Sequence, residues 1–264
     1  MDLQLEGKRA VVSGSTAGIG LAIAAALAHE GATVIVNGRT QSRVDQAISH
    51  IRALSSGANV EGVACDLGTR GGADRLIREV PDADILVNNL GIFEPKAFAD
   101  IPDEDWLRFF EVNVLSGVRL SRHYLPGMVA RKWGRVVFIS SESAVQIPVE
   151  MIHYGVTKTA QVAVARGLAE SVAGTGVTVN SILPGPTASE GVSTFVADMG
   201  RTRGVDAATI EREFFQSVRP SSLIKRFATP EEVAAMVAYV CSGPASATTG
   251  AALRVDGGVV RAIL

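Results

Sequence analysis

The chain has 264 residues, of which 47% are hydrophobic and 20% are charged, and its formal net charge at pH 7 is -2. A soluble chain of this length buries a substantial core, and the composition excludes an intrinsically disordered protein. The small net charge and the pI of about 6.1 provide no basic surface for nucleic acid or for an anionic membrane.

The chain carries few signals for processing, membranes or metals. Residues 1–8 contain no apolar core of signal-peptide length, and no apolar run is long enough to span a bilayer. Cys65 and Cys241 are too few for a disulfide framework and lack a CxxC neighbour, so we expect both in the core. The histidines lack metal-ligand spacing. These features predict a cytoplasmic protein without a metal site.

Short β-branched runs alternate with helical segments along the chain. Strands at Arg9–Ser13 and Thr33–Asn37 are each followed by a helix, at Ile19–Glu30 and Gln41–Leu54. The later elements are predicted strands at Val60–Ala64, Ile85–Asn88, Arg135–Ser140, Val177–Ile182 and Ala252–Val255, and a helix near Pro230–Cys241. Continuous apolar runs are typical of parallel strands covered on both faces. The alternation therefore predicts an α/β fold, a Rossmann-type doubly wound parallel sheet flanked by helices.

The least regular stretch of the sequence is 187–227, which contains Gly191, Gly204 and Pro220. No repeat, low-complexity tract or linker divides the chain, so we expect a single domain, 1–264, with this stretch as an insertion carrying one or two short helices. A long excursion from a compact domain is often an active-site lid. A surface insertion or an assembly contact is the alternative.

A glycine-rich segment lies between the first strand and the first helix. Gly14 is expected to make the tight turn, Gly18 to let the backbone approach a pyrophosphate, and Gly20 to let the helix pack close to the sheet. The helix N-terminus offers N–H groups to phosphates, and loop hydroxyls are expected to add donors. An ordinary turn is the alternative. The predicted cofactor-binding residues here are Gly14, Ser15, Thr16, Gly18, Ile19 and Gly20.

The end of the second predicted strand indicates which nicotinamide cofactor binds. An acidic residue at this place favours NAD through the ribose 2′-hydroxyl, but this chain has Asn37, Gly38 and Arg39. Arg39 is suited to hold a 2′-phosphate by charge-assisted hydrogen bonds. The sequence therefore favours NADP(H), with NAD(H) as the alternative if Arg39 is only a solvated loop residue.

Several motifs follow one another in a fixed order. They are Asn88-Asn89-Leu90-Gly91, Glu111-Val112-Asn113-Val114, Ser140-Ser141, Tyr154-Gly155-Val156-Thr157-Lys158, Pro184-Gly185 and Asp256-Gly257-Gly258. With the glycine loop they closely resemble the short-chain dehydrogenase/reductase superfamily in its single-domain form, whose motifs include TGxxxGIG, NNAG, YxxxK and DGG. Ser13 stands for the first threonine, and Leu90 for the alanine of NNAG. The resemblance covers essentially the whole chain.

The resemblance implies an oxidoreductase that moves a hydride between NAD(P)(H) and a carbonyl or alcohol, such as a 3-oxoacyl thioester or a ketone. It implies four catalytic residues, Asn113, Ser141, Tyr154 and Lys158, with Asn113 ordering a water that leads from Lys158 to solvent. It also implies that Lys158 holds the nicotinamide ribose, and that relatives assemble as homotetramers or dimers. A non-catalytic cofactor-binding sensor of the same fold is the alternative.

The residues themselves support this chemistry. Tyr154 and Lys158 lie four positions apart, on one face of a helix. A lysine ammonium near a phenol lowers the phenol pKa toward neutrality, which suits an acid/base catalyst. Ser141 follows a strand, where its hydroxyl can polarise a substrate oxygen, and Ser140 is the alternative.

The other predicted cofactor contacts follow later strands. Asp66 is expected to meet the adenine amino group, with a turn carboxylate as the alternative role. The full set, besides the glycine loop and Arg39, is Asp66, Leu67, Asn89, Gly91, Tyr154, Lys158, Pro184, Gly185 and Thr187.

Overall fold

The computed structural model describes residues 1–189, 192 and 201–263 of the chain. Seven parallel strands form one sheet in the order β3-β2-β1-β4-β5-β6-β7. The strands are β1 Arg9–Val12, β2 Thr33–Gly38, β3 Val60–Ala64, β4 Ile85–Asn88, β5 Gly134–Ile139, β6 Val177–Pro184 and β7 Ala252–Val255. The predicted Rossmann-type doubly wound sheet is confirmed, and the strand bounds differ from the predictions by at most two residues.

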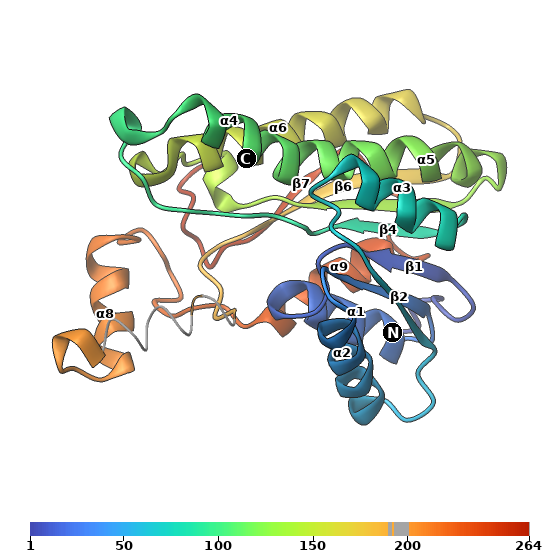
Figure 1. Ribbon diagram of the computed structural model, residues 1–264, viewed down its shortest axis with the longest axis horizontal. Helices are drawn as coiled ribbons and strands as arrows, with labels where there is room; N and C mark the ends of the chain where they lie inside the picture. Colours follow the sequence, from blue (N-terminus) through green and yellow to red (C-terminus); the bar gives the residue numbers. More distant parts are fainter. Residues whose placement is uncertain (190–191, 193–200, 264) are drawn as a thin grey trace.

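Helices cover both faces of the sheet (Figure 1). One face packs against α1 Gly18–His29, α2 Gln41–Leu54 and α9 Pro230–Cys241. The other packs against α3 Arg70–Glu79, α5 Ser116–Ala130 and α6 Ile152–Ser171. The remaining elements are η1 Phe98–Asp100, α4 Asp103–Phe110, η2 Glu111–Leu115, η3 Glu142–Ala144, η4 Val149–Met151 and α8 Ala207–Ser217.

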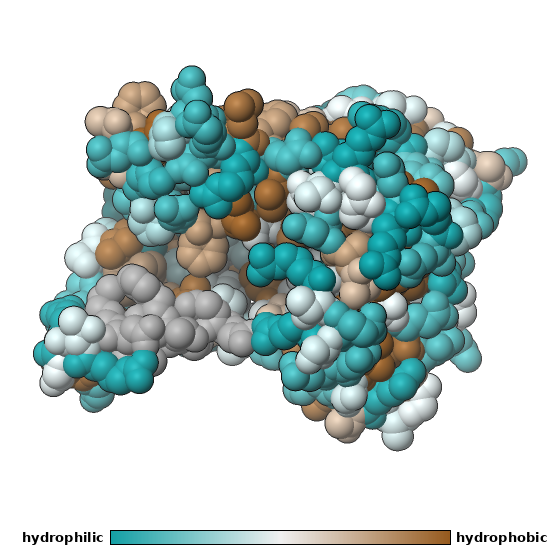
Figure 2. Space-filling view, viewed as in Figure 1, coloured by the Kyte–Doolittle hydropathy of each residue, from teal (hydrophilic) through white to brown (hydrophobic). Residues whose placement is uncertain are grey.

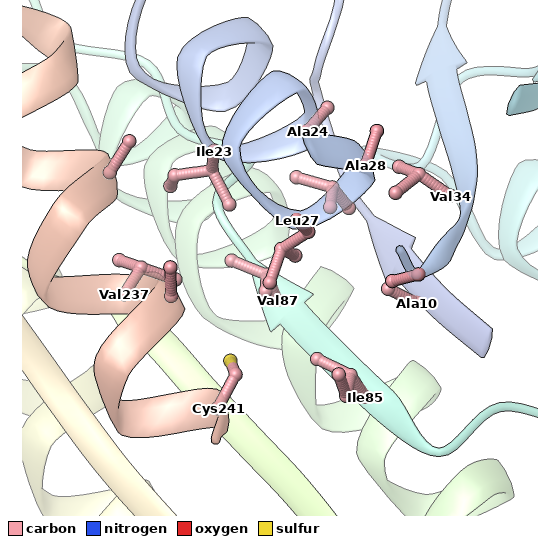
Figure 3. Close-up of a cluster of buried hydrophobic side chains, with 14 of the residues drawn as sticks. Ala10, Ile23, Ala24, Leu27, Ala28, Val34, Ile85, Val87, Val237 and Cys241 are labelled. Carbon is pink, nitrogen blue, oxygen red and sulfur yellow. The ribbon is translucent and has the colours of Figure 1, made fainter. Parts of the chain in front are cut away.

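Side chains of successive strand residues point to opposite faces, so each strand feeds two cores. In β1, Ala10 and Val12 join the core beneath α1 and α9, whereas Val11 joins the core beneath α3 and α5. Figure 3 shows the first of these cores, in which Leu27 of α1 and Val237 of α9 lie over the strands. Both cysteines are buried, as the sequence predicts.

The strand order reverses between β1 and β4, because the chain continues from β1 to β2 on one side and returns to β4 on the other. In open α/β sheets ligands bind at this switch point, outside the carboxyl ends of the strands. The predicted glycine loop, 13–20, follows β1, and the predicted Asn89 and Gly91 follow β4. The topology therefore brings these two segments to one place.

The stretch 187–227 leaves the sheet after β6 and returns to its starting point. Thr187 and Ala228 form an isolated parallel bridge that closes its base. It carries α8, which stands apart from the sheet (Figure 1). Residues 190–191 and 193–200 of the predicted insertion lie outside the described residues. Among the described helices, none is long and apolar enough to cross a membrane.

Candidate active site

A cavity of about 500 Å³ lies at the carboxyl ends of the strands. Its walls come from the loops after β4, β5 and β6 and from α8 and the residues that follow it. The space-filling view shows the molecule hollowed between the α8 region and the helices α4 and α6 (Figure 2). The predicted site residues that line it are Ile19, Asn89, Gly91, Ser141, Tyr154, Lys158, Pro184, Gly185 and Thr187.

The glycine loop is held against the sheet by neutral polar groups. Gly14 has a left-handed backbone with φ of +60°, as expected for the tight turn. A side chain on Gly20 would lie 2.4 Å from both the Gly14 carbonyl oxygen and Asn89 Nδ2. Asn89 Nδ2 in turn donates to the Ser13 and Gly14 carbonyls, each at 3.0 Å. Gly20 therefore allows the close approach of helix and strand loop that the sequence predicts.

Asn37 fixes the same loop from β2. Its Oδ1 accepts a hydrogen bond from the Gly14 N–H at 3.1 Å, while its Nδ2 donates to the carbonyls of Val63 and Cys65. The residue is 2% exposed. Its side chain therefore serves the fold rather than a ribose, a role that the sequence analysis missed.

Ser15 differs from its predicted role. Its hydroxyl is fully buried, donates to the Val12 carbonyl at 2.7 Å and accepts from the Asn37 N–H at 2.9 Å. Its own N–H donates to the Asn37 carbonyl at 2.8 Å. The expectation that this hydroxyl adds a donor to the loop is wrong, because the carbonyl of Val12 in β1 already accepts its proton. Thr16 packs its methyl group over Gly38 instead, since a side chain there would lie 2.4 Å from Thr16 Cγ2.

The start of α1 fits a phosphate group. Ala17 precedes the helix and makes no side-chain cap, whereas the threonines before α2, α3 and α9 each cap their helices. Within the described part of the chain, the first N–H groups of α1 therefore receive no side-chain cap from the residue before the helix. A side chain on Gly18 would lie 3.2 Å from Ser189 Cβ. Arg39, at the far side of this loop, is exposed.

Asp66 and Leu67 follow β3 in a tight turn. Asp66 Oδ1 accepts from the Gly68 N–H at 3.0 Å, and its side chain is exposed at the carboxyl edge of the sheet. Thr69, and not Asp66, caps α3. Leu67 is 1% exposed and belongs to the core. Only its backbone is therefore available to a cofactor.

Ser141, Tyr154 and Lys158 meet at one end of the cavity. Ser141 directly precedes η3 and accepts from the Ser143 N–H at 3.1 Å, so its hydroxyl is held at the end of β5. Tyr154 and Lys158 come from the first turns of α6, and Lys158 Nζ lies 5.6 Å from the centre of the tyrosine ring. Ser140 points away and donates to the Lys158 carbonyl, which favours Ser141 over the alternative.

Burial changes the pKa values of this pair in opposite directions. It lowers the pKa of Lys158 to about 7, because a buried ammonium loses hydration. It raises the pKa of the Tyr154 phenol above its ordinary value, an effect that the Ser141 hydrogen bond opposes and the charge of Glu142 reinforces. From the sequence we expect Lys158 to lower the tyrosine pKa; in the structure, loss of hydration by the buried phenol raises that pKa instead.

Lys158 is anchored by two acceptors on the protein. Its Nζ donates to the Ile139 carbonyl at 2.9 Å and to Gln161 Oε1 at 3.1 Å. Gln161, which is 1% exposed, donates its Nε2 to the Asn113 carbonyl at 2.6 Å. Gln161 therefore links Lys158 to the Asn113 backbone through its side chain. The sequence analysis missed Gln161, although its position three residues after Lys158 places it on the same helical face.

Asn113 lies in η2, a single π-helical segment between α4 and α5, and is fully buried. Its amide accepts from the Ile92 N–H at 2.7 Å and donates to the Ile92 carbonyl and to Thr157 Oγ1. It therefore ties the loop after β4 to α6, beside Lys158. Such π segments are frequent at functional sites.

A buried ion pair joins the two walls of the cavity. Glu142 Oε2 accepts from Ser141 Oγ at 2.5 Å, and its Oε1 accepts from Arg219 Nε at 3.1 Å. The exposed fractions of these two charged side chains are 6% and 11%. Arg219 also pairs with Glu150. No local sequence pattern links Glu142 to an arginine 77 residues away, so the pair could not be predicted from the sequence.

His153 points away from the cavity, as expected for the neighbour of Tyr154 on a helix. Its ring packs 4.0 Å from the ring of Phe109, centre to centre, and is fully buried. Among the residues that the structure describes, no group of three or more histidine, cysteine or acidic side chains could hold a metal ion.

A doubly wound parallel sheet with a glycine loop after its first strand defines a Rossmann-type dinucleotide-binding fold. A family model described as Enoyl-(Acyl carrier protein) reductase matches residues 14–260. The chain belongs to the short-chain dehydrogenase/reductase family. It is an NAD(P)-dependent oxidoreductase acting on CH–OH or C=O groups.

Individual relatives match along their full length. The uncharacterized oxidoreductase YvaG of Bacillus subtilis (strain 168) is 49% identical over 263 residues, covering 100% of both chains. The D-beta-hydroxybutyrate dehydrogenase of Cupriavidus necator is 34% identical and covers 97% of this chain and 99% of its own. The crystal structure of L-sorbose reductase from Gluconobacter frateurii, complexed with NADPH and L-sorbose, superposes with a TM-score of 0.92 at 35% identity over 100% of both chains.

Proposed function

We propose that this chain transfers a hydride between NADP(H) and a ketone or alcohol, with Asn113, Ser141, Tyr154 and Lys158 as its catalytic set. The observation that carries the proposal is the meeting of Ser141, Tyr154 and Lys158 in one cavity at the switch point of the sheet. The bound cofactor supplies the hydride. The NADPH complex of the similar L-sorbose reductase and the exposed Arg39 support NADP(H) as that cofactor.

The protein's own part in a reduction is proton transfer and charge stabilisation. Ser141 donates a hydrogen bond to the carbonyl oxygen, which gains negative charge as its carbon receives the hydride. Tyr154 gives its phenolic proton to that oxygen, which completes the alcohol and leaves a phenolate. The raised pKa of Tyr154 suits this direction, because the phenol stays protonated at neutral pH until an alkoxide, a stronger base, forms beside it.

Lys158 and Asn113 serve the proton supply in this proposal. Lys158 Nζ lies next to Gly91, where an added side-chain carbon would be 3.3 Å from it, so glycine avoids crowding the ammonium group. With a pKa of about 7, Lys158 can take and give a proton at physiological pH. The backbone carbonyl of Asn113, in the π segment, accepts from Gln161, and Gln161 in turn accepts from Lys158 Nζ.

The stretch 187–227 serves as the substrate lid of a single domain in this proposal. Phe214, Val218 and Arg219 from this stretch line the cavity opposite Ser141 and Tyr154. Assembly as a homo-oligomer, dimer or tetramer, is proposed from the family and from apolar side chains exposed on α4 and α6, such as Leu107 and Val156.

The test is the nicotinamide absorbance of purified protein with ketones, 3-oxoacyl thioesters and alcohols, using NADPH and NADH in parallel. We expect turnover with NADPH that falls by about 10²-fold or more in Tyr154→Phe, the range for a lost acid/base group. Cofactor binding without turnover of any substrate would favour a non-catalytic sensor. A Tyr154→Phe variant as active as the native protein would contradict the mechanism.

A further inference from the structure

The carboxylate of Glu142 is the closest charged group to the Ser141 hydroxyl. Its Oε2 accepts from Ser141 Oγ at 2.5 Å and also from the N–H and the hydroxyl of Ser143, at 2.9 and 3.2 Å. Glu142 lines the same cavity as Tyr154 and is 5% exposed. A buried carboxylate is an acceptor only, so this wall of the site favours groups that donate a hydrogen bond.

Ser141 has one hydroxyl proton, and the structure directs it to Glu142. To polarise a substrate carbonyl, Ser141 must turn that proton from Glu142 Oε2 to the carbonyl oxygen, and the carboxylate then lacks one donor. A hydroxyl on the carbon beside the carbonyl reaches the same region and can donate to Glu142 in place of Ser141. A simple ketone cannot make this exchange, and losing a hydrogen bond to a buried charge is costly.

The arginines of the cavity are already paired. Arg219 pairs with Glu142 and Glu150, at 3.1 and 3.2 Å, and Arg203 pairs with Glu213 at 2.6 Å. These are the arginines among the described residues that line the cavity. A substrate carboxylate or phosphate would therefore meet acidic groups without an unpaired guanidinium, which disfavours anionic substrates.

Much of the remaining lining of the cavity is apolar. It includes Ile92, Phe93, Met151, Phe214 and Phe227. These side chains suit the carbon skeleton of a substrate whose polar atoms point toward Ser141 and Glu142.

We infer that the substrate is a neutral ketone with a hydroxyl on the carbon next to the carbonyl, or the corresponding vicinal diol in oxidation, and that Glu142 is the residue that selects it. This inference rests on the proposed function of the Ser141–Tyr154–Lys158 site. The reaction remains the one already described, in which the carbonyl gains a hydride from NADPH and a proton from Tyr154. The hydroxyl beside it only donates to Glu142 and is not altered.

Three four-carbon compounds of similar size test the selection: 1-hydroxy-2-butanone, 2-butanone and 2-oxobutanoate. With NADPH, we expect the native kcat/KM for the hydroxyketone to exceed that for each of the other two by about tenfold or more, the lower range for a hydrogen bond to a buried charge. We expect Glu142→Gln to bring kcat/KM for the hydroxyketone down toward that for 2-butanone, so that the ratio of the two falls; any change at Ser141 or Tyr154 is shared by both substrates. Glu150→Gln, which leaves the Ser141–Glu142 contact in place, should retain the preference.

The possible outcomes distinguish the role of Glu142 in substrate choice from the proposed carbonyl reduction itself. Turnover that depends on Tyr154 but shows no preference for the hydroxyketone, or a preference that survives Glu142→Gln, would overturn the role of Glu142 and leave the proposed function standing. Turnover of none of the three compounds, and of no substrate in the wider panel described above, by a protein that binds NADPH would overturn both. If Glu142→Gln does not fold, as judged from its thermal melt, the ranking of the three compounds by the native protein still decides.

Discussion

The glycine loop and the catalytic segment after β5 both bury polar side chains, but they bury different kinds. Around the glycine loop the buried groups are neutral, namely Ser13, Ser15 and Asn37, and they bond mostly to backbone atoms. At the catalytic end the buried groups Glu142 and Lys158 are charged or titratable. One region uses polar atoms to fix a backbone shape, and the other keeps ionisable groups out of water.

This difference indicates that the catalytic end of the site lowers the free energy of unfolding, whereas the glycine loop does not. A neutral amide whose hydrogen bonds are satisfied stabilises its loop at little cost. A buried lysine or carboxylate loses hydration, and even a good ion pair often fails to recover that loss. We therefore expect substitutions in the glycine loop to affect stability first, and substitutions at the catalytic end to affect activity and pH dependence first.

Lys158→Met should give the largest effect. We expect kcat for carbonyl reduction to fall by about 10²- to 10⁴-fold, the range for a lost acid/base group. The buried lysine should also make the free energy of unfolding of the native protein depend on pH. Above pH 7 the folded chain has released the Lys158 proton while the unfolded chain still holds it, so the stability of the native protein rises with pH until lysine titrates in the unfolded chain.

Thermal melts of both proteins at several pH values between 7 and 10 check this. The stability of the native protein relative to Lys158→Met should increase across the window, because all other titrating groups are common to both. A constant difference would mean that burial does not depress the lysine pKa.

Gly20→Ala should give the largest loss of stability in the glycine loop. The added methyl group would lie 2.4 Å from the Gly14 carbonyl oxygen, and overpacking of this kind costs about 1–3 kcal/mol. Gly71→Ala is the matched control, since nothing lies within 4 Å of the added atom in α3. Chemical denaturation should show a lower midpoint for the first variant only. Equal behaviour of the two would show that the close contact is readily relieved.

Arg39→Ala should change cofactor choice without changing the fold. The side chain is exposed, and removing a charge-assisted contact to the 2′-phosphate should lower kcat/KM for NADPH by about tenfold. Kinetics with NADH should be unaffected, which provides the internal control. A parallel decrease with both cofactors would assign Arg39 a different role.

The smallest effect is expected at Gln161. Gln161→Leu removes an acceptor that stabilises the Lys158 ammonium, so the pKa of that lysine should decrease, by about one unit or less. The pH above which kcat/KM for reduction declines should move down in Gln161→Leu. In Gln161→Glu it should move up, because a carboxylate favours the ammonium. Profiles that coincide with the native one would show that Gln161 does not influence Lys158.

The sequence predicted the sheet well because hydrophobic periodicity reports burial directly. The continuous apolar runs at 34–36 and 136–139 lie in β2 and β5, whose strand residues are nearly all buried. The helical spacing of Tyr154 and Lys158 likewise placed both in one cavity. Local patterns of this kind need no knowledge of a partner.

Other features depend on contacts between distant segments, which no local pattern encodes. The residue types at Ser15 and Asn37 suggest a phosphate donor and a ribose contact, but the two side chains bond to the protein itself. The bridge from Gln161 to the Asn113 carbonyl and the pair of Glu142 with Arg219 also join residues far apart in the sequence. The π segment at Asn113 has no sequence signal that we could recognise.

The central claim is hydride transfer from the cofactor to a carbonyl carbon at the Ser141–Tyr154–Lys158 site. The most direct measurement uses NADPH carrying deuterium at C4 of the nicotinamide, in both stereochemical forms, with mass spectrometry of the alcohol formed. We expect one form to deliver its deuterium to the product carbon in the native protein and neither form to do so in Tyr154→Phe within the same time. Product without deuterium from either form would contradict hydride transfer by this protein.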